Sequence, residues 1–121
     1  MIHYDGKRFA AISNTKNGEV SDATIFHYHQ DGALVWAEYS GGGILKGFLI
    51  GRVHDDYSIE FHYQHMNTCM ETRIGRCRSI PEILPDNRLR LQESWQWLNG
   101  DCTAGESIIE EIRLKSDRRR F

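Results

Sequence analysis

Tight-turn signals recur at short, even intervals along the sequence, and they constrain the fold more than any other feature. Asn17-Gly18 and Asp31-Gly32 are pairs that tolerate positive φ, which the tight turns of β-hairpins require. Comparable signals lie at Gly41–Gly43, His54–Asp56, Asn67-Thr68, Pro85–Asn87 and Asn99–Asp101. The segments between them are too short for crossover helices, so each is expected to pair with its neighbour in an antiparallel sheet. Such spacing is typical of all-β sandwiches and barrels.

Eight strands are expected between these turns. They lie near Lys7–Ser13, Val20–Gln30, Ala33–Ser40, Ile44–Val53, Tyr57–Met66, Glu71–Ile80, Arg88–Leu98 and Gly105–Leu114. The seventh segment alternates strictly, with Leu91, Glu93 and Trp95 on one face and polar residues on the other, which is the period of a strand. The last segment could also be a short helix, but the alternation over Ile108–Ile112 favours a strand.

A closed barrel is the all-β architecture that we expect these strands to form. A flat meander leaves two exposed edges that promote aggregation, and closure removes them. A barrel of eight strands encloses a space that side chains fill or a small ligand occupies. A sandwich would need a long connection, for which Ser79–Asn87, with both prolines, is the one candidate. We therefore predict an all-β fold, a single antiparallel up-and-down barrel of about eight strands, with residues 1–121 as one domain.

Charge and cysteine content limit the classes of partner and compartment. The chain has 15 basic and 17 acidic residues and a formal charge of −2, so neither nucleic acid nor a membrane is expected as a partner. No apolar run approaches the roughly 20 residues that span a bilayer, and residues 1–11 lack the apolar stretch of a secretory signal. Cys69, Cys77 and Cys102 include no Cys-x-x-Cys pair, so no disulfide framework is expected. These features predict a cytoplasmic protein.

Short motifs spread over nearly the whole chain carry a resemblance to known proteins. They are Tyr4–Phe9, Asn14–Val20, Tyr39–Gly42, Tyr63–Asn67, Trp95–Trp97 and Gly105–Ser107. The chain resembles the calycin-like barrels, which include lipocalins, fatty-acid-binding proteins and avidins, and its short loops look most like those of avidins. More narrowly, it is similar to a family of small bacterial proteins, some of which carry the label N-acetylglutamate synthase. The resemblance implies a barrel with a ligand site in its interior.

The sequence gives little support to acetyl transfer, metal binding or nucleophilic catalysis. An acetyltransferase needs a glycine-rich loop that holds the cofactor pyrophosphate, and the nearest fragment, Arg73–Cys77, lacks the second glycine, so no cofactor is expected. His27 and His29 share one strand face, a spacing found in metal sites. His62 or Cys69 would add a ligand only if a loop folded back, so no metal site is predicted. The cysteines have no base beside them in the sequence, and no catalytic residue is assigned.

The strongest local signal for a ligand site is the face of the seventh strand that carries Glu93, Trp95 and Trp97. If this face points inward, two indoles and a carboxylate line the interior, as in many small-molecule pockets. The other interpretation is that the tryptophans fill the barrel, with Glu93 at one mouth. A buried Glu93 would need a partner, for which Arg73 or a tyrosine is the candidate. The remaining candidate ligand-binding residues are Tyr28, Tyr39, Phe61, Tyr63 and His65.

Three functions are compatible with these residues. The first is a barrel that binds a small, partly apolar ligand between the aromatic residues just named, oriented by Glu93 or His65. The second is a solid-cored interaction protein that forms a homodimer through its outer face. The third is a small enzyme with a site in the barrel, which requires a cavity and a perturbed His or Glu near a second polar group.

Overall fold

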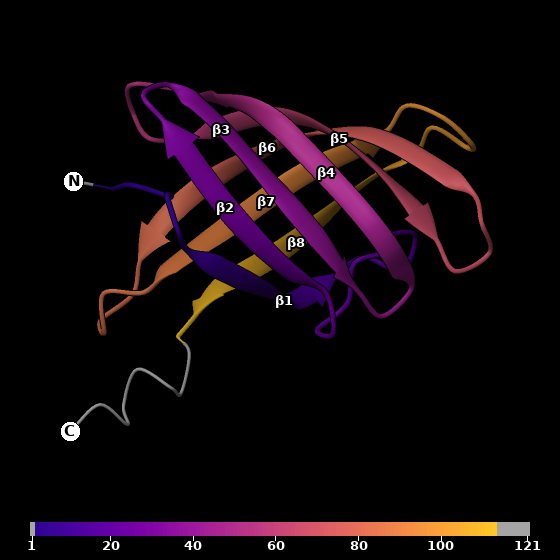
Figure 1. Ribbon diagram of the computed structural model, residues 1–121, viewed down its shortest axis with the longest axis horizontal. Coiled ribbons are helices and arrows are strands. Elements are labelled where there is room, and N and C mark those ends of the chain that lie inside the picture. Colours follow the sequence, from indigo (N-terminus) through magenta and orange to yellow (C-terminus); the bar gives the residue numbers. More distant parts are fainter. Residues whose placement is uncertain (1, 114–121) are drawn as a thin grey trace.

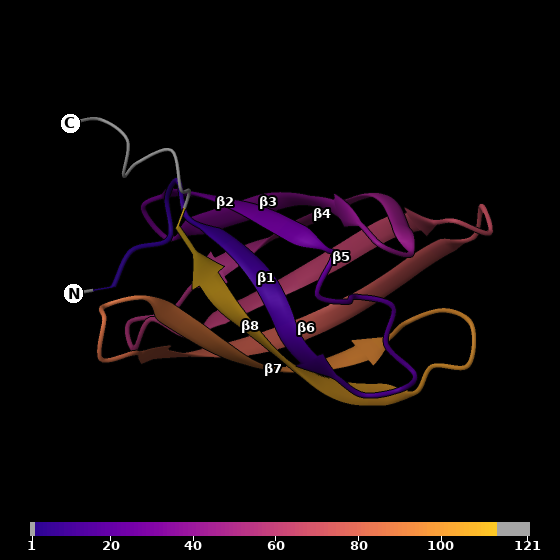
Figure 2. The same cartoon turned by 90° about the horizontal axis from the view of Figure 1, so that it is seen from below.

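The computed structural model describes residues 2–113 and shows a closed barrel of eight antiparallel strands in sequence order (Figure 1). The strands are β1 (Arg8–Asn14), β2 (Ile25–Asp31), β3 (Leu34–Gly41), β4 (Ile44–Val53), β5 (Ile59–Asn67), β6 (Thr72–Ile83), β7 (Leu89–Trp97) and β8 (Ala104–Ile112). β1 also pairs with β8, and this pairing closes the sheet (Figure 2). The predicted fold class is confirmed. Within residues 2–113, no helix has the length and apolar character needed to cross a membrane.

The period-two pattern of the sequence sets which side chains point into the barrel. Along β7 the buried positions alternate with half-buried or exposed ones, as predicted. β8 is also a strand, so the helical alternative for this segment is wrong. Its Ile109 is fully buried while the neighbouring Ile108 is not, which is the alternation of a strand with one face on the core. The expected last residue of this strand, Leu114, lies outside the described residues.

β2 begins five positions later than the sequence predicts, at Ile25 instead of Val20. The residues before it form a turn in which the Thr24 amide donates to the Ser21 carbonyl. The Thr24 hydroxyl also donates to the Gly41 carbonyl at the end of β3, 3.0 Å away. A Ser or Thr side chain bonded to nearby backbone offers the chain an alternative to a sheet ladder. Residues 15–24 therefore form a long connection between β1 and β2.

β6 is longer than the sequence predicts because it continues through Pro81 to Ile83. β5 pairs with β6 only as far as Ser79, whereas β7 pairs with it up to Ile83. Beyond Ser79 the strand thus has one unpaired edge, and an edge is where a strand tolerates proline. The segment considered as a Greek-key connection is mostly strand, which is consistent with the up-and-down order.

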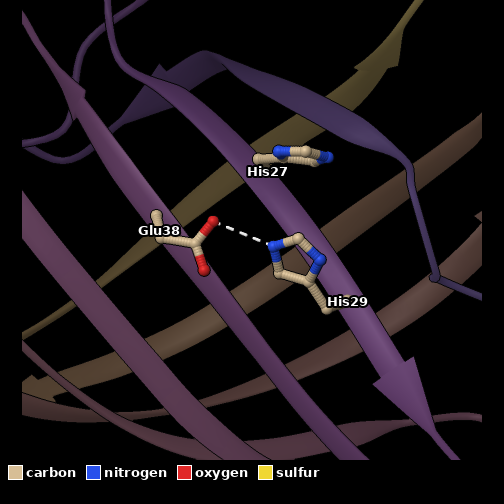
Figure 3. A group of neighbouring side chains, drawn as sticks. All are labelled: His27, His29 and Glu38. Atoms are coloured by element: carbon tan, nitrogen blue, oxygen red, sulfur yellow. Dashed lines mark hydrogen bonds and ion pairs between the residues drawn. The ribbon is translucent and has the colours of Figure 1, made fainter.

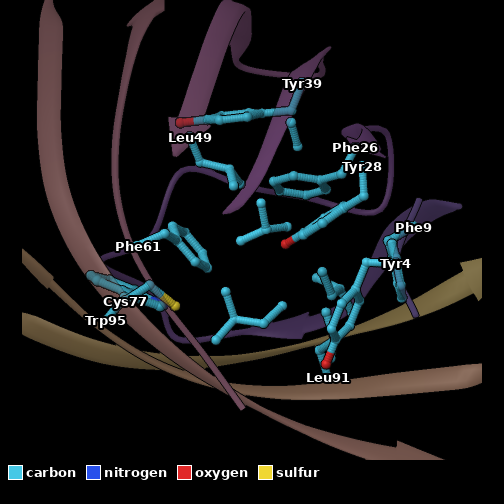
Figure 4. Close-up of a cluster of buried hydrophobic side chains, with 14 of the residues drawn as sticks. Tyr4, Phe9, Phe26, Tyr28, Tyr39, Leu49, Phe61, Cys77, Leu91 and Trp95 are labelled. Carbon is cyan, nitrogen blue, oxygen red and sulfur yellow. The ribbon is translucent and has the colours of Figure 1, made fainter. Parts of the chain in front are cut away.

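The two ends of the barrel differ in how they are filled. The closed end carries the turns 32–33, 54–58 and 84–88, and the N-terminal segment packs into it. Here Tyr4 and Tyr28 are fully buried, with ring centroids 6.2 Å apart, and Phe9 and Leu91 complete the cluster (Figure 4). The Tyr4 hydroxyl donates to the Tyr57 carbonyl over 2.6 Å. Side chains therefore fill this half of the barrel.

The opposite end, which we call the loop end, is formed by the connections 15–24, 42–43, 68–71 and 98–103. Large rings enter the barrel near this end, and each lies across a glycine on the neighbouring strand. The three cross-strand pairs are Tyr39 with Gly47, Tyr63 with Gly75, and Trp95 with Gly105. A Cβ atom added to these glycines would lie 2.2 to 2.4 Å from ring or hydroxyl atoms. Glycine is required at these places because the rings occupy the space of a side chain.

Replacing Gly75 by alanine is expected to destabilise the protein by about 1–3 kcal/mol, because the added methyl group would displace the Tyr63 ring from a packed position. Gly43→Ala is the matched control, since the nearest atom to its added Cβ is 3.9 Å away. Urea denaturation measures both variants. Equal stability of Gly75→Ala and the wild type would contradict the packing described.

Candidate functional site

A cavity lies inside the barrel near the loop end. Its free volume, counted as the space open to the centres of water molecules, is about 40 Å³, which is enough for a few of them. Its walls are formed by Asn14, Gly18, Glu19, Val20, Phe26, Tyr39, Leu49, Phe61, Tyr63, His65, Cys77, Glu93, Trp95, Trp97 and Ser107. Most of the candidate ligand-binding residues are among them. Tyr28 and Arg73 are not, because Tyr28 packs in the closed end and Arg73 lies at the mouth.

Aromatic rings form most of the cavity wall. Trp95 and Trp97 are both buried, with ring centroids 5.2 Å apart, and Tyr63 meets Trp97 edge to face at 5.8 Å. Phe61 adds a further ring beside Tyr63. The Trp97 indole N–H donates to the Asn17 carbonyl, 2.9 Å away in the β1–β2 connection. This bond satisfies the polar atom of Trp97 and leaves its ring as an apolar surface.

Glu93 is the one carboxylate on the inner face of β7, and it lies buried between two serines. The Ser79 hydroxyl donates to one carboxylate oxygen over 2.8 Å, and the Ser107 hydroxyl donates to the other over 3.0 Å. Burial raises the pKa of Glu93 to about 7, although both hydrogen bonds act to lower it. The prediction that Arg73 or a tyrosine is the partner of Glu93 is therefore wrong. Both serines stand directly opposite Glu93 on β6 and β8, and only the strand register reveals this.

Tyr28 brings an unused hydrogen-bonding group into the barrel interior. Its hydroxyl is buried and has no hydrogen-bond partner among residues 2–113. Figure 4 shows this hydroxyl pointing into the middle of the cluster. Burial, and then the charge of Glu93, raise the pKa of Tyr28 well above its ordinary value. A buried hydroxyl without a partner is costly, so a polar atom placed beside it would gain a hydrogen bond.

A polar cluster closes the mouth of the cavity, and we call it the Glu19 latch. It consists of Glu19 from the β1–β2 connection together with His65, Asn67 and Arg73 from β5 and β6. One Glu19 oxygen lies 2.8 Å from His65 Nε2, and the other accepts from Asn67 at 3.2 Å and from Arg73 at 3.1 Å. The Arg73 guanidinium also stacks over the Trp97 ring at 4.0 Å. The latch therefore ties the connection to the barrel rim.

His65 links the latch to the inside of the barrel. Its Nδ1 lies 3.0 Å from the Tyr39 hydroxyl, and its Nε2 faces Glu19. Burial lowers the pKa of His65, which favours the neutral ring, although the bond to Glu19 acts in the other direction. A neutral ring with its proton on Nε2 donates to Glu19 and accepts from Tyr39. His65, one of the candidate ligand-binding residues, therefore belongs both to the Glu19 latch and to the cavity wall.

The family to which the chain belongs follows from one comparison. A family model described as "Avidin-like protein" matches residues 2–112, which include every strand of the barrel. The chain belongs to the avidin-like protein family. A search of curated proteins and a search of solved structures each found no match. The avidin-like fold is one that supports small-ligand binding in general, and the resemblance to calycin-like and avidin-like barrels is confirmed.

Within this avidin-like barrel, the combination of Glu93 and its serines also permits proton transfer. A carboxyl group with a pKa of about 7 is present in both its protonated and its ionised form near neutral pH. The cavity and the second polar group that an enzyme site requires are both present. This arrangement allows Glu93 to exchange a proton with a bound molecule.

Loss of the Glu19 carboxylate is expected to free residues 15–24 from the rim of the avidin-like barrel. The variant Glu19→Ala removes contacts to three side chains, so amide hydrogen exchange in this connection should accelerate at least about tenfold. Exchange within β6 and β7 should stay unchanged. Glu106→Ala is the control, because this exposed residue lies beside the connection and outside the latch. Unchanged exchange in Glu19→Ala would show that the Glu19 latch does not hold residues 15–24 against the barrel rim.

Proposed function

We propose that this avidin-like protein binds a small, mostly apolar molecule in the cavity of the loop end, with a hydrogen-bonding group at the inner end of the ligand. The observation that carries the proposal is the buried Glu93 beneath an aromatic-walled space that side chains leave partly unfilled. Apolar burial against the rings would supply most of the affinity. Glu93 would fix the orientation, as a few placed polar groups do in pockets.

The inner end of the ligand is expected to carry an N–H or O–H donor and no negative charge. Glu93 accepts hydrogen bonds when ionised, and within residues 2–113 no lysine or arginine lines the cavity. An anion placed there would meet a buried carboxyl group without a compensating cation, which is costly. A neutral donor group would instead form a hydrogen bond to Glu93.

Ligand size is coupled to the position of the β1–β2 connection. With the latch closed, about 40 Å³ is open to the centre of a water molecule, which suits a ligand of only a few non-hydrogen atoms. A larger ligand needs the space now covered by Gly18, Glu19 and Val20. Binding of such a ligand would therefore displace the connection and break the contacts of the latch.

Filling the cavity provides the test of this proposal. Cys77 lines the cavity and Cys69 is exposed, so Cys77→Met and Cys69→Met make the same change inside and outside the site. Small neutral amides and alcohols with an apolar body are titrated while tryptophan fluorescence is followed, because Trp95 and Trp97 form the wall. The wild type and Cys69→Met should bind the same compounds, and Cys77→Met should bind them at least about tenfold more weakly. Equal affinities in all three proteins would refute binding in the cavity.

A homodimer is the second candidate function, and the outer face of β3 and β4 favours it. Leu34, Phe48 and Ile50 are between 44 and 48% exposed there, and Trp36 pairs with Ile50 across the two strands. Exposed apolar patches often mark sites of protein association. Phe48→Glu is expected to convert a dimer into a monomer in sedimentation velocity, while Cys77→Met leaves the oligomeric state unchanged. A wild-type protein that is monomeric at about 100 μM would refute this candidate.

A further inference from the structure

The outer surface of the β2–β3 hairpin gathers three side chains that bind metals. His27 and His29 project from β2 and Glu38 projects from β3 (Figure 3). One ligand atom from each lies within 4.8 Å of the other two. We infer that these residues form a binding site for a divalent transition-metal ion of the zinc class. The site lies on the outside of the barrel and does not depend on the proposed function of the cavity.

The hairpin holds the three residues in place before any ion binds. His27 and Glu38 stand directly opposite each other in the strand register, and His29 follows His27 on the same face. Only residues 32 and 33 separate the paired ends of the two strands, so the register is fixed by a tight turn. The His29 ring stacks on Trp36 at a centroid distance of 5.4 Å, which restrains its orientation. Two imidazoles and a carboxylate thus meet on a regular part of the sheet.

The distances within the cluster fit an ion after small side-chain rotations. His29 Nε2 now lies 2.8 Å from a Glu38 oxygen, and the two imidazole centroids are 4.6 Å apart. Two ligands at about 2.0–2.1 Å from a tetrahedral zinc ion are separated by about 3.3 Å. The ion would replace the hydrogen bond between His29 and Glu38, and the neutral His29 ring would bind it through Nε2 with the ring proton on Nδ1. A water molecule would complete the tetrahedron.

The donor set and its neighbours decide which metals fit. Two neutral imidazoles and one carboxylate suit zinc and cobalt, whereas calcium and magnesium require mainly oxygen ligands. Arg8 and Lys46 line the same shallow surface as His27 and Glu38. Their positive charges oppose any ion that is held by charge alone, so the bonds to nitrogen must supply the affinity. Discrimination against calcium is therefore part of the inference.

The sequence alone does not predict this site, because the third ligand is on a different strand from the two histidines. The sequence shows the histidine pair, and the further ligands that it suggests are His62 and Cys69, on condition that a loop folds back. The third ligand is Glu38, which the strand register places beside the pair. His62 lies on β5, which is separated from β3 by the whole of β4. Identifying Glu38 as the third ligand requires the register of the β2–β3 hairpin, which places it opposite His27.

The test uses zinc and cobalt as probes of the full chain. The exposed thiols are first replaced, as Cys69→Ser and Cys102→Ser, because free cysteines also bind these metals. In this background we expect one equivalent of zinc in equilibrium dialysis, with no competition from a hundredfold excess of calcium. His27→Ala and Glu38→Gln should each weaken zinc binding at least about tenfold. With cobalt, the background protein should show the visible absorption bands of a four-coordinate site.

His54→Ala is the matched control for these variants. His54 Nε2 lies 2.5 Å from a Glu60 oxygen, and this pair contains one histidine where the proposed site contains two. This variant should bind zinc as tightly as the background protein does. Near-ultraviolet circular dichroism checks that each variant keeps its fold. Absence of a zinc equivalent at 100 μM metal, or equal affinity in His27→Ala, Glu38→Gln and the control, would overturn the inference.

Discussion

At pH 8, the variant Glu93→Gln is expected to be more stable than the wild type by about 3 kcal/mol, and near pH 4 the two should be almost equally stable. The native pKa of Glu93 is about 7, whereas its ordinary value is 4.5. Between these two values the unfolded chain has released its proton and the folded chain still holds one. Folding stability of the wild type therefore falls as the pH rises through this range, by about 1.4 kcal/mol for each pH unit. Glutamine cannot ionise and escapes this loss.

Urea denaturation of both proteins from pH 4 to pH 8.5 measures this difference, which corresponds to about 10 °C in Tm for a chain of this size. Burial lowers the pKa of His65, but His65 is present in both proteins, so its contribution cancels in the difference. Glu106→Gln serves as the control, because it makes the same substitution at an exposed position of β8. A difference between Glu93→Gln and the wild type that does not vary with pH would show that Glu93 is not buried as described.

Truncation of Tyr4 to alanine is expected to cost about 4 kcal/mol, which lowers Tm by about 15 °C. Tyr4 is fully buried at the closed end, and its ring packs near Tyr28. Alanine would leave a cavity the size of a ring where the N-terminal segment enters the barrel. The hydrogen bond from the Tyr4 hydroxyl to the Tyr57 carbonyl would also be lost.

Tyr4→Phe separates the two contributions, because it keeps the ring and removes only the hydroxyl. It should cost about 1 kcal/mol. Neither variant changes a residue of the cavity wall, so ligand affinity measured at a temperature where both are folded should match the wild type. A loss below about 1 kcal/mol in Tyr4→Ala would mean that the N-terminal segment does not help to fill the barrel.

The fold was predictable because its signals are local. Turn pairs such as Asp31-Gly32 mark where strands end, and alternation marks which side chains point inward. The differences arose where a contact distant in sequence decides the local structure. Val20–Thr24 is not strand because Thr24 bonds the carbonyl of Gly41, and Pro81 is in a strand because β5 ends its pairing before it. Neither relation can be read from a short window of sequence.

The site was predictable only on its inner wall. The period-two pattern placed Glu93 and Trp95 on one face of β7 and Phe61 on one face of β5, and the structure turns these faces inward. The serines around Glu93 and the Glu19 latch were missed. Ser79 and Glu93 are 14 positions apart, and Glu19 and His65 are 46 positions apart. Such pairs depend on register and on the path of an irregular connection, for which the sequence has no periodic signal.

The glycines beneath the aromatic rings make the breadth of the interior sensitive to very small genetic changes. Gly47, Gly75 and Gly105 are not among the residues of the cavity wall, yet each determines how flat a neighbouring ring can lie. A single methyl group at one of these backbone positions would tilt a ring inward and narrow the chamber. Homologous barrels can thus diverge in what they accommodate while every side chain facing the guest molecule stays the same.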